Sequence, residues 1–153
     1  MAQPVPNHPN LRGGFAPLQM ECDVNDLVIE GEIPRALNGS FYRNGPNPQY
    51  APRGHYHWFG GDGMVHAFHV EDGRVAYRNR WVRTIKWQKE REAGRSLFSA
   101  FNPLDNDDSV AGLETDGVAN TNIIWHGGKL LALEEGHAPV SYTHLTLPTS
   151  AIV

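Results

Sequence analysis

Two stretches of the chain alternate apolar and polar side chains around a pair of turn residues, and this pattern limits the fold most. The first stretch covers residues 64–84 with an Asp-Gly pair at 72–73, and the second covers residues 122–135 with a Gly-Gly pair at 127–128. Alternation with a period of two is typical of half-buried strands, and both pairs favour two-residue hairpin turns. Two antiparallel hairpins without a βαβ unit predict an all-β fold, either a propeller or a sandwich.

The remaining segments have less regular patterns. Residues 27–33 alternate and predict a strand, and residues 40–43 predict a second, short one. Residues 44–48 contain two prolines, one glycine and two asparagines, which predicts a rigid loop. Residues 85–98 lose the period of two and predict a short surface helix that ends near Gly94.

Composition excludes several classes of function. The chain has 153 residues, a net charge of −4 and a single cysteine, Cys22. The negative charge argues against nucleic acid as a partner, and one cysteine excludes a disulfide framework and a cysteine-based zinc site. The sequence has no apolar run of about 18 residues and no secretory signal over residues 1–10, so we expect a cytoplasmic location.

Histidines and carboxylates are the candidate functional residues. Of the eight histidines, His55 and His57 form a pair that could share a metal, but a polar loop is the simpler interpretation, because no third ligand is suitably spaced. His66 shares a strand face with apolar residues and is expected to be a hydrogen-bonded core residue. Glu134 and Glu135 end a strand, where neighbours point to opposite sides, so we expect one inward carboxylate that needs a partner.

Several segments together resemble the start of the carotenoid cleavage oxygenase family, which includes stilbene-cleaving dioxygenases and the retinoid isomerase. These segments are NLRGGFAPL (10–18), LVIEGEIPRALNGSFYRNGPNPQY (27–50), HWFGGDGMVHAF (57–68), YRNRWVRT (77–84), AGRSLF (93–98) and ANTNIIWHGGKLLALEEG (119–136). The likeness covers residues 9–139, and RNGPNP together with GDGMVHAF is its most specific part.

The resemblance implies the N-terminal part, about two blades, of a seven-bladed β-propeller. It implies Fe²⁺ on the propeller axis, held by four histidines that three glutamates orient. It implies that O₂ is inserted across a conjugated C=C bond of an apolar small molecule, which yields two carbonyl products. Peripheral contact of the full-length protein with a membrane is left open.

Few of the family's functional positions match this chain. None of its histidines matches an iron ligand, so we expect these 153 residues to hold no iron and to be inactive alone. Glu135 matches the first glutamate behind an iron-bound histidine, and Phe101 and Glu134 match positions of the substrate tunnel. Stilbene-cleaving members tend to have Tyr and Lys there, so Phe101 and Glu134 favour a carotenoid or apocarotenoid. The alternatives are a stilbene-cleaving dioxygenase, an isomerase and a non-catalytic propeller that only binds.

The end of the chain differs from the rest. Residues 141–153 contain no charged side chain, and VSYTHLTLPTSAIV (140–153) resembles translated sequencing-adapter read-through at the ends of bacterial metagenomic gene fragments. The alternative is a genuine, uncharged terminal strand. We therefore expect an extended N-terminal arm at 1–26, a partial propeller at 27–139 and a non-native tail at 140–153.

Overall fold

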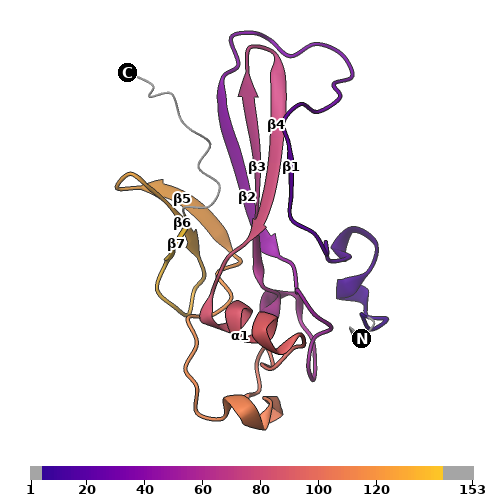
Figure 1. The fold of residues 1–153 in the computed structure, drawn as a ribbon, viewed down its shortest axis with the longest axis vertical. Coiled ribbons are helices and arrows are strands. Elements are labelled where there is room, and N and C mark those ends of the chain that lie inside the picture. The colour runs from indigo at the N-terminus through magenta and orange to yellow at the C-terminus, as the bar shows by residue number, and fades with distance from the viewer. Residues whose placement is uncertain (1–4, 143–153) are drawn as a thin grey trace.

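Two antiparallel sheets and one helix make up the structure, a computed structural model that describes residues 5–142 (Figure 1). The larger sheet has the strand order β1-β4-β3-β2 and the smaller one the order β5-β6-β7. The strands are β1 (Cys22–Val24), β2 (Gly39–Pro46), β3 (Gly63–Glu71), β4 (Arg74–Trp81), β5 (Asn122–His126), β6 (Lys129–Leu133) and β7 (Val140–Tyr142), and the helix is α1 (Ile85–Ala93). The predominance of strands agrees with the predicted fold class.

Both hairpins form where the alternation predicts them. β3 and β4 pair along their length around a turn in which Asp72 and Gly73 have φ angles of 47° and 76°. β5 and β6 pair around Gly127 and Gly128, whose φ angles are 58° and 75°. Positive φ at both central residues gives the turn a twist that matches the twist of the strands.

The strand predicted over residues 27–33 is wrong. Leu27 donates its N–H to the Val75 carbonyl at 2.8 Å, but the following residues do not continue the ladder. Their side chains still alternate between half-buried and exposed, and Val28 is 96% exposed. β4 pairs with β1 instead, and Gly31, with a φ of 96°, interrupts the extended backbone.

The loop predicted over residues 44–48 begins later than expected. β2 continues through Pro46, which pairs with Gly63 at the end of the ladder with β3. In the part of the chain that the structure describes, β2 is an edge strand. Proline is tolerated at a sheet edge, because no neighbouring strand requires its missing N–H. The two prolines of residues 44–48 therefore exclude a central strand but not an edge strand.

The helix ends at Gly94 as its sequence predicts, but it is less exposed than expected. The Thr84 hydroxyl accepts a hydrogen bond from the Trp87 N–H at 3.1 Å, and Gly94 follows the last turn with a φ of 68°. Lys86, Trp87 and Glu90 are buried, so one face of α1 packs against the rest of the protein. No helix within residues 5–142 has the length and apolar character needed to cross a membrane.

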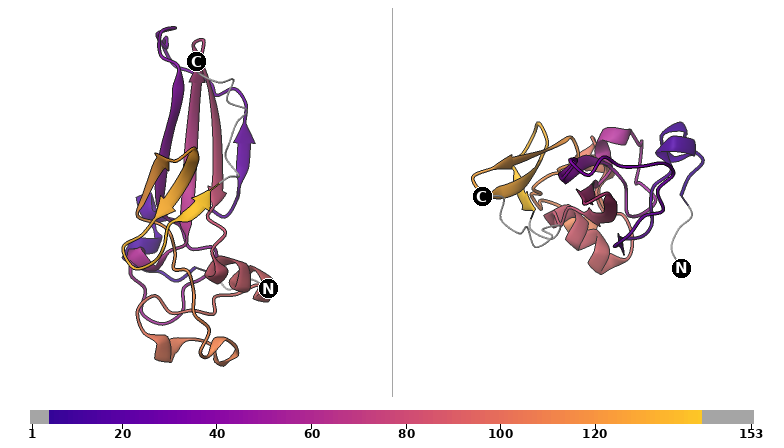
Figure 2. Two further views of the ribbon diagram at one scale, coloured as in Figure 1. Left: turned by 90° about the vertical axis from the view of Figure 1, so that its left-hand side faces the viewer. Right: turned by 90° about the horizontal axis from the view of Figure 1, so that it is seen from above.

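The two sheets share a hydrophobic core. The smaller sheet lies beside one half of the larger sheet, at the end where α1 and the long loops gather (Figures 1 and 2). The core is formed by buried residues of both sheets and of the segments that join them, namely Val65, Ala67, Val82, Ala119, Leu130, Ala132 and Tyr142. Packing between the sheets therefore fixes the loops at this end relative to one another.

The three expected parts of the chain stay a prediction. β1 lies within the expected arm at 1–26 and pairs with β4 as a strand of the larger sheet. Residues 140–142 of the expected tail form β7, which pairs with β6. The remaining tail residues, 143–153, lie outside the described residues.

Candidate functional site

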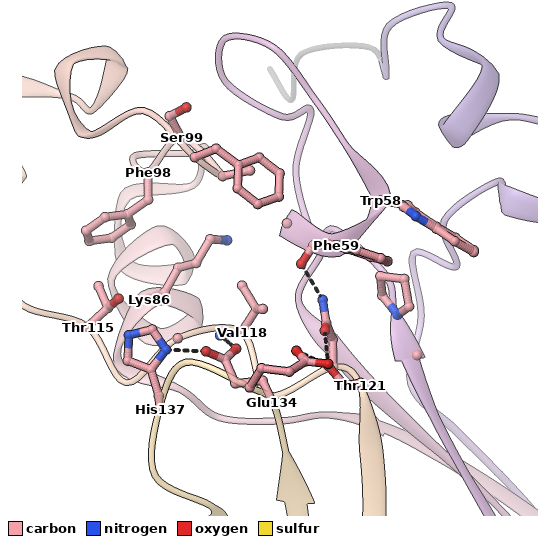
Figure 3. A pocket seen from close by; sticks show the side chains of 18 of the residues that line it. Trp58, Phe59, Lys86, Phe98, Ser99, Thr115, Val118, Thr121, Glu134 and His137 are labelled. Atoms are coloured by element: carbon pink, nitrogen blue, oxygen red, sulfur yellow. Dashed lines mark hydrogen bonds and ion pairs between the residues drawn. The ribbon is translucent and has the colours of Figure 1, made fainter.

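A cavity of about 710 Å³ lies where loops from both sheets meet α1 (Figure 3). Phe101, Glu134 and Glu135, the three residues selected from the sequence, all line it. Further aromatic side chains also line it, namely Trp58 and Phe59 from the turn before β3 and Phe98 from the loop that contains Phe101. An apolar, aromatic surface with a few polar groups is typical of a site for a small molecule.

One wall of the cavity, residues 117–121, is bound to the turn before β3. The side-chain amide of Asn120 donates to the carbonyl oxygens of Phe59 and Gly61, both at 2.7 Å. Asn120 is buried, so these hydrogen bonds satisfy polar groups that water does not reach. The glycine-rich turn at residues 60–63 thus positions a wall of the site.

Gly63 holds the same wall by close backbone contact. Its N–H donates to the Val118 carbonyl at 2.8 Å. A Cβ atom at Gly63 would overlap the carbonyl oxygen of Ala119, so no larger residue fits without displacing the wall. This close approach gives a physical reason for glycine as the last residue of the GGDG sequence.

Glu134 is the better anchored of the two carboxylates. Its Oε2 accepts hydrogen bonds from the backbone N–H groups of Val118 at 2.6 Å and Ala119 at 2.8 Å, and its Oε1 contacts Nδ1 of His137. The Glu134 side chain is 9% exposed, whereas that of His137 is 42% exposed. Hydrogen bonds to a charged acceptor are strong, so the three contacts hold this carboxylate in one orientation.

Glu135 lies beside it with fewer contacts. Its Oε2 accepts a hydrogen bond from the Thr121 hydroxyl at 3.2 Å, and the residue is exposed. The expectation that Glu134 and Glu135 face opposite sides is wrong, because β6 ends at Leu133 and the alternation ends with it. The assignment of Glu135 behind an iron-bound histidine stays a prediction.

Phe101 lies in an exposed part of the lining. Its ring is 62% exposed, and its centroid lies 5.9 Å from that of the His57 ring. A phenylalanine adds apolar surface and no hydrogen-bonding group to the cavity. Its role, like that of Glu134, stays a prediction from the family position.

A buried cluster of charges lies beside the cavity. Lys86, one of the lining residues, donates to Asp62 at 2.7 Å and to Glu90 at 2.8 Å. Burial alone would lower the pKa of Lys86, but the two carboxylates outweigh it and raise that pKa above its usual value. Lys86 is therefore charged and already paired, which leaves little of its binding capacity for a ligand.

The histidines of the described residues do not form a metal site. His57 lies in the loop before β3, where its Nδ1 accepts a hydrogen bond from the Phe59 N–H at 3.2 Å. This position agrees with the simpler interpretation of a polar loop. His66 is half-buried, and its Nδ1 lies 2.7 Å from the Tyr77 hydroxyl, as expected of a hydrogen-bonded core residue. Within residues 5–142 no three His, Cys, Asp or Glu side chains are grouped to hold a metal, so these residues alone do not fit an iron centre.

Lys86 and His137 also line the cavity and were not selected from the sequence. Lys86 and Glu90 are four residues apart within the predicted helix, and this spacing indicates a helical pair but not its burial. His137 was noted only as a histidine that matches no iron ligand. Its position three residues after Glu134, directly behind the end of a strand, is the signal that could have indicated a contact between the two.

Comparisons with known proteins identify the family. The family model described as retinal pigment epithelial membrane protein matches residues 15–153. The chain belongs to this family. Other members are carotenoid oxygenases, and the two sheets are accordingly part of a β-propeller, as the resemblance implied.

Three members of the carotenoid oxygenase family show how much of such a protein the chain covers. An isoeugenol monooxygenase of Pseudomonas nitroreducens is 46% identical over 150 residues, which are 97% of this chain and 31% of that protein. A carotenoid 9,10(9',10')-cleavage dioxygenase 1 of Phaseolus vulgaris is 37% identical over 88% of this chain and 27% of its own length. The crystal structure of a lignostilbene dioxygenase of Pseudomonas brassicacearum superimposes with a TM-score of 0.87 and 40% identity, over 95% of this chain and 31% of that one. The chain thus spans less than a third of these relatives.

Proposed function

We propose that the chain is the N-terminal part of a non-haem iron(II) dioxygenase that cleaves a conjugated C=C bond to two carbonyl products. Membership of the carotenoid oxygenase family supports this class of reaction. The observation that carries the proposal for these residues is the cavity of about 710 Å³, in which aromatic rings and two carboxylates meet. Such a surface suits a flat, apolar, conjugated molecule.

In this proposal the described residues bind the substrate and orient one iron-bound histidine. The iron ligands themselves lie elsewhere in the whole protein. The rings of Trp58, Phe59 and Phe98 provide apolar surface for the conjugated chain. Glu135 would accept a hydrogen bond from an iron-bound histidine and fix its ring, as carboxylates behind metal ligands commonly do. Its exposed side chain, with one contact at 3.2 Å to Thr121, leaves acceptor capacity for that bond.

A carotenoid or apocarotenoid is the substrate class of this proposal. Phe101 contributes only apolar surface, and Glu134 replaces the cation that stilbene-cleaving members tend to have. A phenolic arylalkene is the second candidate. It is favoured by the overall identity, which is 46% to an isoeugenol monooxygenase and 37% to a carotenoid dioxygenase.

Aerobic incubation of the full-length protein tests both candidates. β-Apo-8'-carotenal, isoeugenol and a hydroxystilbene would each be supplied, the carbonyl products separated by chromatography, and the iron content measured. Cleavage of the apocarotenal supports the first candidate, and cleavage of only the phenolic substrates supports the second. A full-length protein that holds no stoichiometric iron and cleaves none of the three contradicts the proposal and indicates a binding module.

A further inference from the structure

We propose that Glu90 is a positioning residue that holds the ring of Phe98 in the wall of the cavity before a ligand binds. The inference rests on the proposed function, because it concerns how the cavity receives the substrate of that reaction. Phe98 lines the cavity, whereas Glu90 belongs to α1 and is 1% exposed. In Figure 3 Phe98 and Lys86 lie on one side of the view and Trp58 lies on the other.

The carboxylate of Glu90 binds the backbone of the loop that follows α1. Its Oε1 accepts hydrogen bonds from the N–H groups of Leu97 at 2.9 Å and Phe98 at 3.1 Å. The same oxygen accepts from the Ser96 hydroxyl at 3.2 Å. The side chain of Glu90 is 2% exposed, so water does not compete for these bonds. Hydrogen bonds to a charged acceptor are strong, and these fix the backbone from which the ring of Phe98 extends.

Lys86 holds the other oxygen of Glu90. Its Nζ donates to Oε2 of Glu90 at 2.8 Å and to Oδ1 of Asp62 at 2.7 Å. Backbone N–H groups and an ammonium group can only donate, so both oxygens of Glu90 act as acceptors. With these partners the carboxylate has one orientation, in which Oε1 faces the loop and Oε2 faces Lys86.

Two further contacts hold the loop just beyond Phe98. The Ser99 N–H donates to Oδ1 of Asn106 at 2.8 Å. A Cβ atom at Gly60 would overlap the Cβ atom of Ala100, so the turn before β3 and the loop approach closely. Neither contact involves the N–H of Phe98 itself, so neither replaces the carboxylate of α1.

The position of Phe98 matters for a flat, conjugated ligand, because its ring supplies apolar surface to the cavity. Binding is weaker when it must also immobilise a side chain of the protein, and a ring that is already held avoids this cost. The effect involves the conjugated part of the ligand and none of its hydrogen-bonding groups. Loss of Glu90 should therefore weaken binding and leave the reaction of the bound substrate unchanged.

Hydrogen exchange tests the positioning without any ligand. Deuterium uptake at the amides of Leu97 and Phe98 would be measured by mass spectrometry in the full-length protein. Glu90→Leu removes the acceptor, and we expect both amides to exchange about tenfold faster. Glu90→Gln keeps an oxygen that accepts from both N–H groups while Lys86 stays paired with Asp62, so exchange should remain close to that of the parent protein.

Asn79→Ala is the matched control for a general loss of stability. Like Glu90→Leu, it removes one side chain that binds two backbone groups, here the Cys22 N–H and the Met20 carbonyl. Asn79 belongs to β4 and the larger sheet. We expect this variant to leave the exchange of the two loop amides and the affinity for ligands unchanged.

Ligand affinity tests whether Glu90 acts through Phe98. β-Apo-8'-carotenal, isoeugenol and a hydroxystilbene would each be titrated anaerobically into the full-length protein, with tryptophan fluorescence as the signal. We expect Glu90→Leu to weaken binding about three- to tenfold. In a Phe98→Leu background the same change should have little effect, because the ring is already absent. For a ligand that is cleaved aerobically, KM should rise by the same factor while kcat is unchanged.

The outcomes separate the positioning role from the reaction. Unchanged exchange in Glu90→Leu, or equally fast exchange in Asn79→Ala, overturns the positioning role. Faster exchange without loss of affinity, an equal loss of affinity in the Phe98→Leu background, or no binding of any of the three ligands overturns it as well. Faster exchange and weaker binding without aerobic cleavage contradict only the proposed reaction, and cleavage with unchanged exchange contradicts only the role of Glu90.

Discussion

Nζ of Lys86 lies 2.7 Å from Oδ1 of Asp62, and this ion pair joins the first turn of α1 to the turn that precedes β3. Glu90, one turn further along α1, accepts from the same Nζ at 2.8 Å with Oε2. Its Oε1 accepts from the N–H groups of Leu97 at 2.9 Å and Phe98 at 3.1 Å. The cluster thereby connects the glycine-rich turn, the helix and the loop that brings Phe98 to the cavity.

Replacing Lys86 by Met would leave two buried carboxylates without their cation. The side chains of Asp62 and Glu90 are each 2% exposed, so we expect the free energy of unfolding to fall by about 3–5 kcal/mol. Urea unfolding of the full-length protein measures the loss. Lys89→Met, which breaks an exposed pair with Glu92, is the control and should cost less than about 1 kcal/mol. Equal losses in the two variants would show that burial does not determine how much the ion pairs contribute to the free energy of unfolding.

Tyr56 makes stability depend on alkaline pH. Burial, with a smaller effect of Asp62, raises the pKa of its phenol to about 12 from the usual 10.0. The folded state holds this proton more tightly than the unfolded chain, so the contribution is complete below pH 10.0 and is lost as pH rises toward 12. Free energies of unfolding across this range should decrease less steeply in Tyr56→Phe than in the parent protein. Identical slopes would contradict the assignment.

Gly63→Ala should displace the wall of the cavity. The added methyl group overlaps the Ala119 carbonyl oxygen, and overpacking of this kind costs about 1–3 kcal/mol. Affinity for any cavity ligand should fall as well, because residues 117–121 carry the donors that hold Glu134. Gly45→Ala in the neighbouring strand meets nothing within 4 Å and should change stability by less than about 1 kcal/mol. Thermal unfolding and ligand titration of both variants make the comparison.

Asn79 ties the N-terminal segment to the larger sheet. Its Oδ1 accepts from the Cys22 N–H at 2.7 Å, and its Nδ2 donates to the Met20 carbonyl at 3.0 Å. Asn79→Ala leaves these backbone groups without partners and should cost about 1–3 kcal/mol. Trypsin should then cleave after Arg12 faster than in the parent protein. The exposed Asn38→Ala serves as control, and an equal rate of cleavage in both variants would contradict the role of Asn79.

Local patterns predicted the parts of the fold that local interactions determine. The Asp72-Gly73 turn and the end of α1 at Gly94 depend on residues close in sequence, and both are where the sequence places them. The prediction of a strand over residues 27–33 was wrong because another segment, Cys22–Val24, pairs with β4 instead. β3 pairs with one edge of β4, and Cys22–Val24 pairs with part of the other edge. The side chain of Asn79 holds that segment by a hydrogen bond to the Cys22 N–H.

Three members of the candidate site were predictable from the sequence, but their arrangement was not. Family positions selected Phe101, Glu134 and Glu135, and the structure brings all three to one cavity. The contact of Glu134 with His137 depends on where β6 ends, and a period of two cannot indicate that end. The burial of Lys86 could not be predicted from the sequence either. Spacing along a helix shows which residues are neighbours, but it does not show which face of the helix is covered.

Some of the residues that line the cavity are held firmly and others are not. Glu134 directly follows the ladder of β6 and is fixed by backbone donors, whereas Phe101 belongs to a loop and is 62% exposed. A ligand anchored at the firmly held residues loses little further freedom there, because the protein side is already ordered. In the proposed enzyme, the part of the wall around Glu134 therefore keeps its shape when a ligand binds, whatever the length of that ligand.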